Sequence, residues 1–326
     1  MNLNLRLLLT RTDIAALLIF VILCVLFSFI NGRFMTPGNI TVYLQPIPEL
    51  AIVAMGVTIL IISGEFDLSV GSVFALAPMV TVLLMTGGNV PMPLAIAAGL
   101  LVAATVGFVN AWFTLGLKIP SFIATLGMLF MARSLTIVLA GGFPPVFPRG
   151  APVDWLTGRV EIWGIAPRIS VLVMFAIALV LGFVLRRMDF GHWIYATGGH
   201  PQAARDMGIN TTRVKTAAFV LCSTLAGFAG IIQSFRLKVI VPNLGTGLEL
   251  QAIAAAVIGG VALSGGIGSV GGAIVGVLLL ALIENILILS GLNANWFLFA
   301  IGAMIVMAVV LNTQIRHRAE GSRGHQ

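Results

Sequence analysis

Charged residues are scarce in this sequence of 326 residues. Asp, Glu, Lys and Arg together make up 9% of it, against about 25% in ordinary soluble domains. Apolar residues make up 59%, and the mean hydropathy is +1.09. Hydrophobic cores stop growing near ~250–300 residues, so one soluble globule cannot bury this much apolar surface. The shortage of charge therefore excludes a water-soluble domain and indicates that most of the chain lies in lipid.

Cysteines and clusters of basic residues are also few. Cys24 and Cys222 both lie inside apolar runs, so we expect two inert, small hydrophobic side chains rather than a disulfide or a metal pair. Lys and Arg exceed Asp and Glu by 18 to 11. The basic residues are spread between long apolar runs, however, so no basic face for a nucleic acid can form. A nucleic-acid-binding function is excluded.

Motifs for catalysis and nucleotide binding are missing as well. The sequence has no HExxH, no Gly-x-Ser-x-Gly and no CxxC, and its four histidines do not have metal-ligand spacing. No lysine follows a glycine as in a phosphate-binding loop, so we expect no enzyme activity, cofactor or metal. One GxGxxG at 266–271 lies between two apolar runs, where a dinucleotide site is not expected. The spacing of Gly268, Gly272 and Gly276 instead favours close packing of membrane helices.

Ten apolar stretches come close to the ~20 residues that cross a membrane as a helix. They are 13–31, 47–63, 68–86, 92–115, 121–140, 169–187, 215–235, 249–264, 269–289 and 294–312. The sequence therefore predicts an all-α polytopic membrane protein, with about ten transmembrane helices in a single domain over 1–326. Counting Lys and Arg on alternate sides places both termini in the cytoplasm. Two long connections follow from this topology, an outer loop at 141–168 and an inner loop at 188–214.

Two similar glycine-rich breaks interrupt the apolar runs at 63–71 and 264–271. Each contains Ser-Gly followed by Ser-Val-Gly, and they lie about 200 residues apart. Glycine-interrupted segments in corresponding places of two halves indicate a transport site. Two alternatives stay open: these broken segments re-enter the membrane, or they are tight turns at the cytoplasmic face where Asp67 caps the next helix.

Polar side chains at membrane depth are costly and are candidates for function. Arg133 lies midway along 121–140 and Glu284 lies within 269–289. Ion pairs or hydrogen bonds that fix helix packing are the alternative role. The candidate translocation pathway comprises Glu65, Asp67, Ser69, Asn110, Arg133, Glu249 and Glu284.

The inner loop is predicted to contain a short helix. Pro201 suits a first helical position and Gly208 suits the residue after a helix end. Because the chain has no motor of its own, this helix is the place where a separate motor could bind; a simple surface connector is the alternative. The candidate coupling residues are His200, Pro201, Ala203, Ala204, Arg205, Asp206 and Gly208.

Four sequence blocks resemble a known family. They are GEFDLSVG at 64–71, KIPSFIATLG at 118–127, YATGGHPQAARDMGI at 195–209, and the glycine-rich block at 245–272. The chain resembles the membrane permease of carbohydrate-type ATP-binding-cassette importers, the family of ribose, xylose, arabinose and galactose permeases. The resemblance implies that the coupling segment corresponds to about 200–208.

Several partners are implied by the same resemblance. They are a second permease copy or paralogue, two cytoplasmic ATPase subunits or one fused tandem ATPase, a periplasmic sugar-binding protein, and the lipid of the bacterial inner membrane. We expect Trp155, Trp163 and Arg236 to receive the binding protein; an interfacial anchor is the alternative for Trp163. The expected cargo is a small carbohydrate, that is, a pentose, hexose, deoxy sugar or polyol.

This chain departs from the family at four places. Glu65-Phe66 stands where Gly-Ile is usual, Gln233 and Gln251 stand where acids are common, and Glu284 replaces an uncharged polar residue. These departures leave the identity of the sugar open. The alternative function is an ion-coupled secondary transporter of a small polar solute, using Glu284, Asp67 or Arg133.

Overall fold

The computed structural model describes residues 12–148, 153–293, 296–304, 306–307 and 310, with side chains described from residue 16 onward. Within these residues the chain forms helices and turns. Strand pairing there is limited to three isolated β-bridges. The expected all-α class is confirmed.

The helices begin at α2 in chain order. They are α2 (Thr12–Ile30), α3 (Pro37–Tyr43), α4 (Ile47–Ile62), α5 (Val70–Gly87), α6 (Met92–Ala111), the π-helical turn η1 (Trp112–Gly116), α7 (Ser121–Ala140), α8 (Asp154–Thr157), α9 (Ile169–Arg187), α10 (Asp189–Gly199), α11 (Pro201–Asp206), α12 (Thr211–Leu237), α13 (Leu248–Ile258) and α14 (Val270–Leu289).

Seven helical segments of the described chain are long and apolar enough to cross a membrane. They are Pro37–Ile62, Val70–Gly87, Met92–Gly116, Ser121–Ala140, Ile169–Arg187, Thr211–Leu237 and Val270–Leu289. The first joins α3 to α4, a helical extension that the sequence did not predict.

The other three of the ten expected spans have different outcomes. The stretch 13–31 forms α2. The stretch 249–264 is wrong as a crossing helix, because α13 has 11 residues, about 16 Å of helix against a hydrocarbon core of ~30 Å. The stretch 294–312 is helical at 296–304, and its end lies outside the described residues, as do both chain termini.

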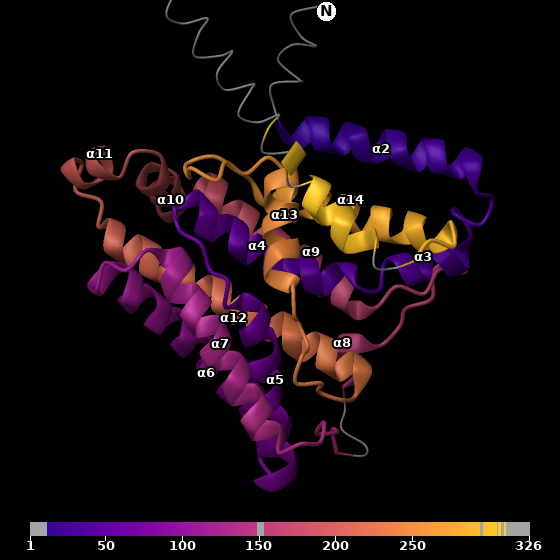
Figure 1. Ribbon diagram of the computed structural model, residues 1–326, viewed down its shortest axis with the longest axis horizontal. Helices are drawn as coiled ribbons and strands as arrows, with labels where there is room; N and C mark the ends of the chain where they lie inside the picture. The colour runs from indigo at the N-terminus through magenta and orange to yellow at the C-terminus, as the bar shows by residue number, and fades with distance from the viewer. Residues whose placement is uncertain (1–11, 149–152, 294–295, 305, 308–309, 311–326) are drawn as a thin grey trace, which may run out of the picture.

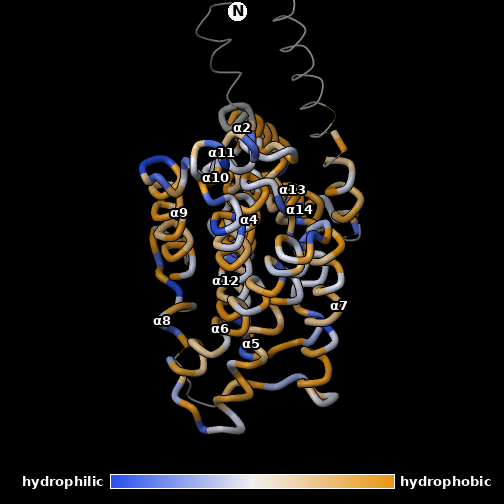
Figure 2. The backbone as a smooth tube through the Cα atoms, turned by 90° about the vertical axis from the view of Figure 1, so that its left-hand side faces the viewer, coloured by the Kyte–Doolittle hydropathy of each residue, from blue (hydrophilic) through white to orange (hydrophobic). Residues whose placement is uncertain are grey.

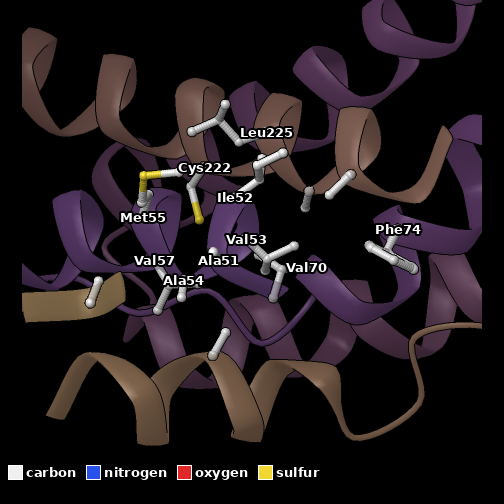
Figure 3. Close-up of a cluster of buried hydrophobic side chains, with 14 of the residues drawn as sticks. Ala51, Ile52, Val53, Ala54, Met55, Val57, Val70, Phe74, Cys222 and Leu225 are labelled. Atoms are coloured by element: carbon white, nitrogen blue, oxygen red, sulfur yellow. The ribbon is translucent and has the colours of Figure 1, made fainter. Parts of the chain in front are cut away.

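Helix α4 forms the centre of the bundle. Its residues from Ala51 to Ile62 are almost completely buried, as expected for a helix that is apolar on every side. Figure 3 shows α4 side chains packed beside Cys222 and Leu225 of α12. Both cysteines are free thiols, and Cys222 is fully buried. Cys24, by contrast, is only partly buried.

The two long connections lie at opposite ends of the bundle. Helices α10 and α11, from the inner loop, lie at one end, and α8, from the outer loop, lies toward the other (Figures 1 and 2). Hydrophobic segments run along most of the helices between them (Figure 2). This separation agrees with the topology expected from charge counting.

Candidate functional site

The two similar breaks meet in space at the α10 end of the bundle. The Gly266 amide donates a hydrogen bond to the Ile62 carbonyl at 2.8 Å. Gly198, near the end of α10, packs against the same carbonyl so closely that a Cβ there would collide with it. Gly64 and Gly265 both have positive φ, which glycine adopts without strain. Their shared sequence therefore reflects a shared meeting point beside α10.

A third break, at 238–247, lies in the connection predicted between the stretches 215–235 and 249–264. Helix α12 ends at Leu237, and Lys238 adopts a left-handed conformation with φ 58°. Val239 then pairs with Val146 of the outer loop before α13 begins at Leu248. Pro242, Gly245 and Gly247 lie in this connection, and both glycines have positive φ. Proline and glycine interrupt regular structure.

Asp67, Ser69 and Asn110 are brought together in a buried hydrogen-bond network. The Asp67 carboxylate accepts hydrogen bonds from the Ser69 amide at 2.8 Å and the Ser69 hydroxyl at 2.6 Å. It also accepts from the Asn110 amide at 3.3 Å and from the Ser223 hydroxyl at 3.1 Å. Asp67 is 1% exposed. Donors of the protein itself surround the carboxylate, so this network joins the start of α5 to α6 and α12.

Glu65 lies apart from this network, in an ion pair. Its carboxylate accepts a hydrogen bond from the Lys215 ammonium at 2.6 Å, and both side chains are largely buried. Thr211, Lys118 and Arg205 line the same small cavity. Glu65, which departs from the family pattern, is therefore paired with a basic residue near the start of α12, Lys215.

Arg133 and Glu249 lie at the third break. The Arg133 guanidinium donates to the carbonyls of Pro242 at 2.8 Å and Leu244 at 2.7 Å, and to the carbonyl of Gly71 at 3.1 Å. Glu249 accepts from the Gly247 amide through one oxygen, and its other oxygen is buried against Gly71. Arg133 therefore fixes the turns before α13 to α5, which corresponds to the packing alternative.

A polar cavity of about 190 Å³ holds the remaining pathway residue, Glu284. The wall comes mainly from α4, α12, α13 and α14, with Phe297 beside them, and its polar residues are Glu49, Gln233, Arg236, Gln251 and Glu284. Arg236 donates to Glu49 at 2.9 Å. The second Glu49 oxygen is buried without a protein partner. Three of the four departures from the family pattern thus face one cavity.

Glu49 was not among the predicted site residues. It follows Pro46-Ile-Pro48 at the start of a long apolar run, so the rule that flagged Glu284 could have identified it. Arg236 was expected at a docking surface with Trp155 and Trp163. The structure shows Arg236 in the cavity wall, in an ion pair with Glu49. Trp163 is 96% exposed at a turn of the outer loop, and Trp155 is half-exposed on α8.

The short helix predicted in the inner loop is present as α11. Pro201 is its first residue and Gly208, with φ 86°, follows its end. Ala203, Arg205 and Asp206 are exposed, as are His200 and Gly208 beside the helix. Ala204, by contrast, is 3% exposed. The expectation that Ala204 contacts a partner is corrected: it faces this chain, and Ala203 lies on the open side.

Comparison with known proteins identifies the family. The family described as branched-chain amino acid transport system / permease component matches residues 39–309. The chain is 34% identical to the ribose import permease protein of Escherichia coli over 301 residues, covering 92% of this chain and 93% of that protein. It is 32% identical to the autoinducer 2 import system permease protein of Shigella flexneri over 304 residues, covering 93% of this chain and 87% of that protein.

No solved structure matches the chain. The family match covers most of the sequence, and the two relatives are permeases of import systems. Together with the seven apolar helices, these matches confirm a multi-pass protein of the bacterial inner membrane. The chain belongs to the family of branched-chain amino acid transport system permease components, among the carbohydrate-type permeases of ATP-binding-cassette importers.

Proposed function

We propose that this chain passes a small, neutral, polyhydroxylated carbohydrate through the membrane, energised by ATP hydrolysis on a separate subunit. The observation that carries the proposal is the polar cavity among four helices, which contains two carboxylates, two amides and one guanidinium. Carboxylates accept, and amides both donate and accept, the hydrogen bonds that sugar hydroxyls form. Two relatives are permeases of import systems named for ribose and for autoinducer 2.

The charges in the cavity favour a neutral cargo. Glu49 is paired with Arg236, which leaves Glu284 as an additional acidic group in the same wall. An anionic solute, such as a sugar phosphate, would be repelled by Glu284. The branched apolar side chain of an amino acid would leave these polar groups without partners, which is costly in a buried site. A hydroxylated neutral solute satisfies them.

The proposed assembly consists of two permease chains, cytoplasmic ATPases on α11 and a periplasmic binding protein on the outer loop. Exposed Ala203, Arg205 and Asp206 would contact the ATPase. Trp155 and Trp163 would contact the binding protein. The names of the relatives, both import permeases, support this kind of assembly. The partners of this chain and their stoichiometry are part of the proposal.

Uptake into proteoliposomes that contain the permease, its ATPase and its binding protein tests the cargo. The probes are D-ribose, D-xylose, L-arabinose, D-galactose and D-sorbitol, with L-leucine as the contrasting solute. We expect ATP-dependent uptake of at least one sugar or polyol and none of L-leucine. Uptake of L-leucine without any of the five carbohydrates would contradict the proposal.

Two variants test the cavity. Glu284→Leu should lower transport of the accepted sugar about ten- to hundredfold, because a hydrogen bond to a charged group contributes ~1.5–3 kcal/mol. Glu284→Gln should lower it less, since the amide oxygen still accepts. Asp189→Asn is the matched control, because it removes an exposed carboxylate at the start of α10. Equal transport by Glu284→Leu and Asp189→Asn would place the pathway outside this cavity.

A further inference from the structure

A groove of about 890 Å³ lies between α9 and the start of α14. Its walls are mainly apolar, with Phe175, Leu179 and Phe183 on α9 and Val270 and Ile274 on α14. The three α9 side chains are more than half exposed. Figure 2 shows α9 at the edge of the bundle. The groove is therefore open to the membrane and separate from the polar cavity, which α9 does not line.

The groove becomes basic at the end where α9 meets α10. Arg186 and Arg187, the last two residues of α9, line this end and are exposed. None of the described residues that line the groove is acidic, and the ion pairs found in the described chain are Glu65–Lys215 and Glu49–Arg236. Two guanidinium groups thus stand at the mouth of an apolar groove without a carboxylate partner in its wall.

The length of the apolar wall matches one leaflet of a bilayer. Phe175 and Arg187 are 12 residues apart on α9, which corresponds to about 18 Å of helix. Half of a ~30 Å hydrocarbon core is about 15 Å. A hydrocarbon chain that starts at the arginines would therefore end near Phe175, at the middle of the membrane.

We propose that this groove binds an anionic phospholipid of the inner leaflet. The phosphate diester accepts hydrogen bonds from Arg186 and Arg187, whose planar groups suit phosphate oxygens. One acyl chain lies along the α9 wall. Basic pockets between membrane helices on the cytoplasmic side favour anionic head groups in general. A free phosphate would use the arginines and leave the apolar wall exposed, so the whole groove fits a lipid better.

The arginine end of the groove lies beside the second glycine-rich break, at 264–271. Tyr195 of α10 lines the same end of the groove, and its hydroxyl donates to the Gly268 carbonyl at 2.8 Å. Gly268 precedes α14 directly in the second break. A bound lipid would therefore contact α9, the start of α14 and the α10 residue that holds the second break, and would stabilise their arrangement.

Native mass spectrometry of the purified chain, titrated with palmitoyl-oleoyl phosphatidylglycerol or phosphatidylcholine, tests the proposal. We expect the anionic lipid to bind about 25-fold more tightly, since each of the two arginines near an anionic lipid contributes about fivefold. Arg186→Gln with Arg187→Gln should abolish this preference. Arg186→Lys with Arg187→Lys, which keeps both charges, should retain most of it. Lys118→Gln, which removes a cation elsewhere, is the control and should leave the preference unchanged.

A second pair of variants tests the apolar wall. Gly182 lines the groove, and a Cβ there would meet no atom within 4 Å. Because a side chain can start at this position, Gly182→Trp should occupy part of the groove and weaken binding of both lipids. Gly127 on α7 has equally open surroundings, so Gly127→Trp is its matched control and should bind lipid as the wild type does.

Three results would overturn the proposal. Equal affinity for the two lipids, or an unchanged preference in the double glutamine variant, would remove the head-group site. Inorganic phosphate that competes fully, together with normal binding by Gly182→Trp, would indicate a free-anion site. Disulfide cross-linking of two copies through Gly182→Cys would indicate that a second chain fills the groove.

Discussion

At the scale of single residues, the carboxylate of Asp67 shows how a charge is accommodated inside the helix bundle. It accepts hydrogen bonds from one backbone amide, two hydroxyls and one side-chain amide. These donors come from the start of α5, from α6 and from α12. In addition, the backbone amide of Phe66 donates to the Ser121 hydroxyl of α7, and that of Leu68 donates to the Thr125 hydroxyl. The first glycine-rich break, at 63–71, is therefore held in place by side chains from three neighbouring helices.

The stability of Asp67 variants tests this interpretation. Asp67→Leu leaves several buried donors without an acceptor, each at a cost of ~1–3 kcal/mol, so we expect a loss of at least about 3 kcal/mol and poor assembly. Asp67→Asn keeps the size and one acceptor oxygen, and should lose less. Thermal unfolding in detergent measures the difference. If both variants unfold as the wild type does yet transport poorly, Asp67 acts on the cargo instead.

Sequence reasoning identified polar residues but could not identify their partners. A charged residue inside an apolar run is visible from hydropathy, which is why Arg133 and Glu284 were selected, whereas Asp67 was selected from the glycine-rich break at 63–71. The partners come from distant helices: Ser223 lies 156 residues from Asp67, and Arg236 lies 187 residues from Glu49. Such pairings depend on helix packing, which a single sequence does not encode as a local pattern.

At the scale of elements, hydropathy predicted most helices and failed where the backbone changes conformation inside an apolar run. The run 249–264 continues past the end of α13, and the chain turns through Gly260, Gly265 and Gly266, all with positive φ. The side chains remain apolar through this turn, so their hydropathy gives no boundary. The glycines were read as a break after the span, but they begin inside it.

The close contact between α13 and α14 gives a prediction. A Cβ on Gly276 would collide with the Ala255 carbonyl, whereas a Cβ on Gly271 of the same helix meets no atom within 4 Å. Gly276→Ala should therefore destabilise the protein by about 1–3 kcal/mol through overpacking. Gly271→Ala, the control, should be neutral or slightly stabilising, since alanine favours a helix. Similar unfolding temperatures for the two variants would contradict this packing.

Helix α11 allows a test of the proposed motor contact. Ala203 is exposed and Ala204 is buried on the same short helix. Ala203→Trp should give a folded permease that binds its ATPase much more weakly, because a bulky group on the open side blocks a close-fitting groove. Ala204→Trp should instead disturb how α11 packs on its own chain. Co-purification with the ATPase measures the first effect and thermal unfolding measures the second. ATPase recruitment by Ala203→Trp at the wild-type level would place the contact elsewhere.

At the scale of the whole molecule, α12 makes polar contacts at three depths along its length. Lys215 pairs with Glu65, Ser223 reaches Asp67, and Arg236 pairs with Glu49. Lys215 and Arg236 are 21 residues apart on one helix, about 32 Å, which is close to the ~30 Å hydrocarbon thickness. The two ion pairs therefore fall near the two membrane surfaces, as the expected orientation requires, and the buried network lies between them.

The energy source of uptake tests the central claim most directly. In the proteoliposomes described above, uptake of the accepted sugar is measured with and without ATP on the ATPase side. It is then repeated after ionophores have collapsed the proton and sodium gradients. We predict uptake that requires ATP and the ATPase and is unchanged by the ionophores. Uptake by the permease alone, without ATP and driven by an ion gradient, would contradict the claim.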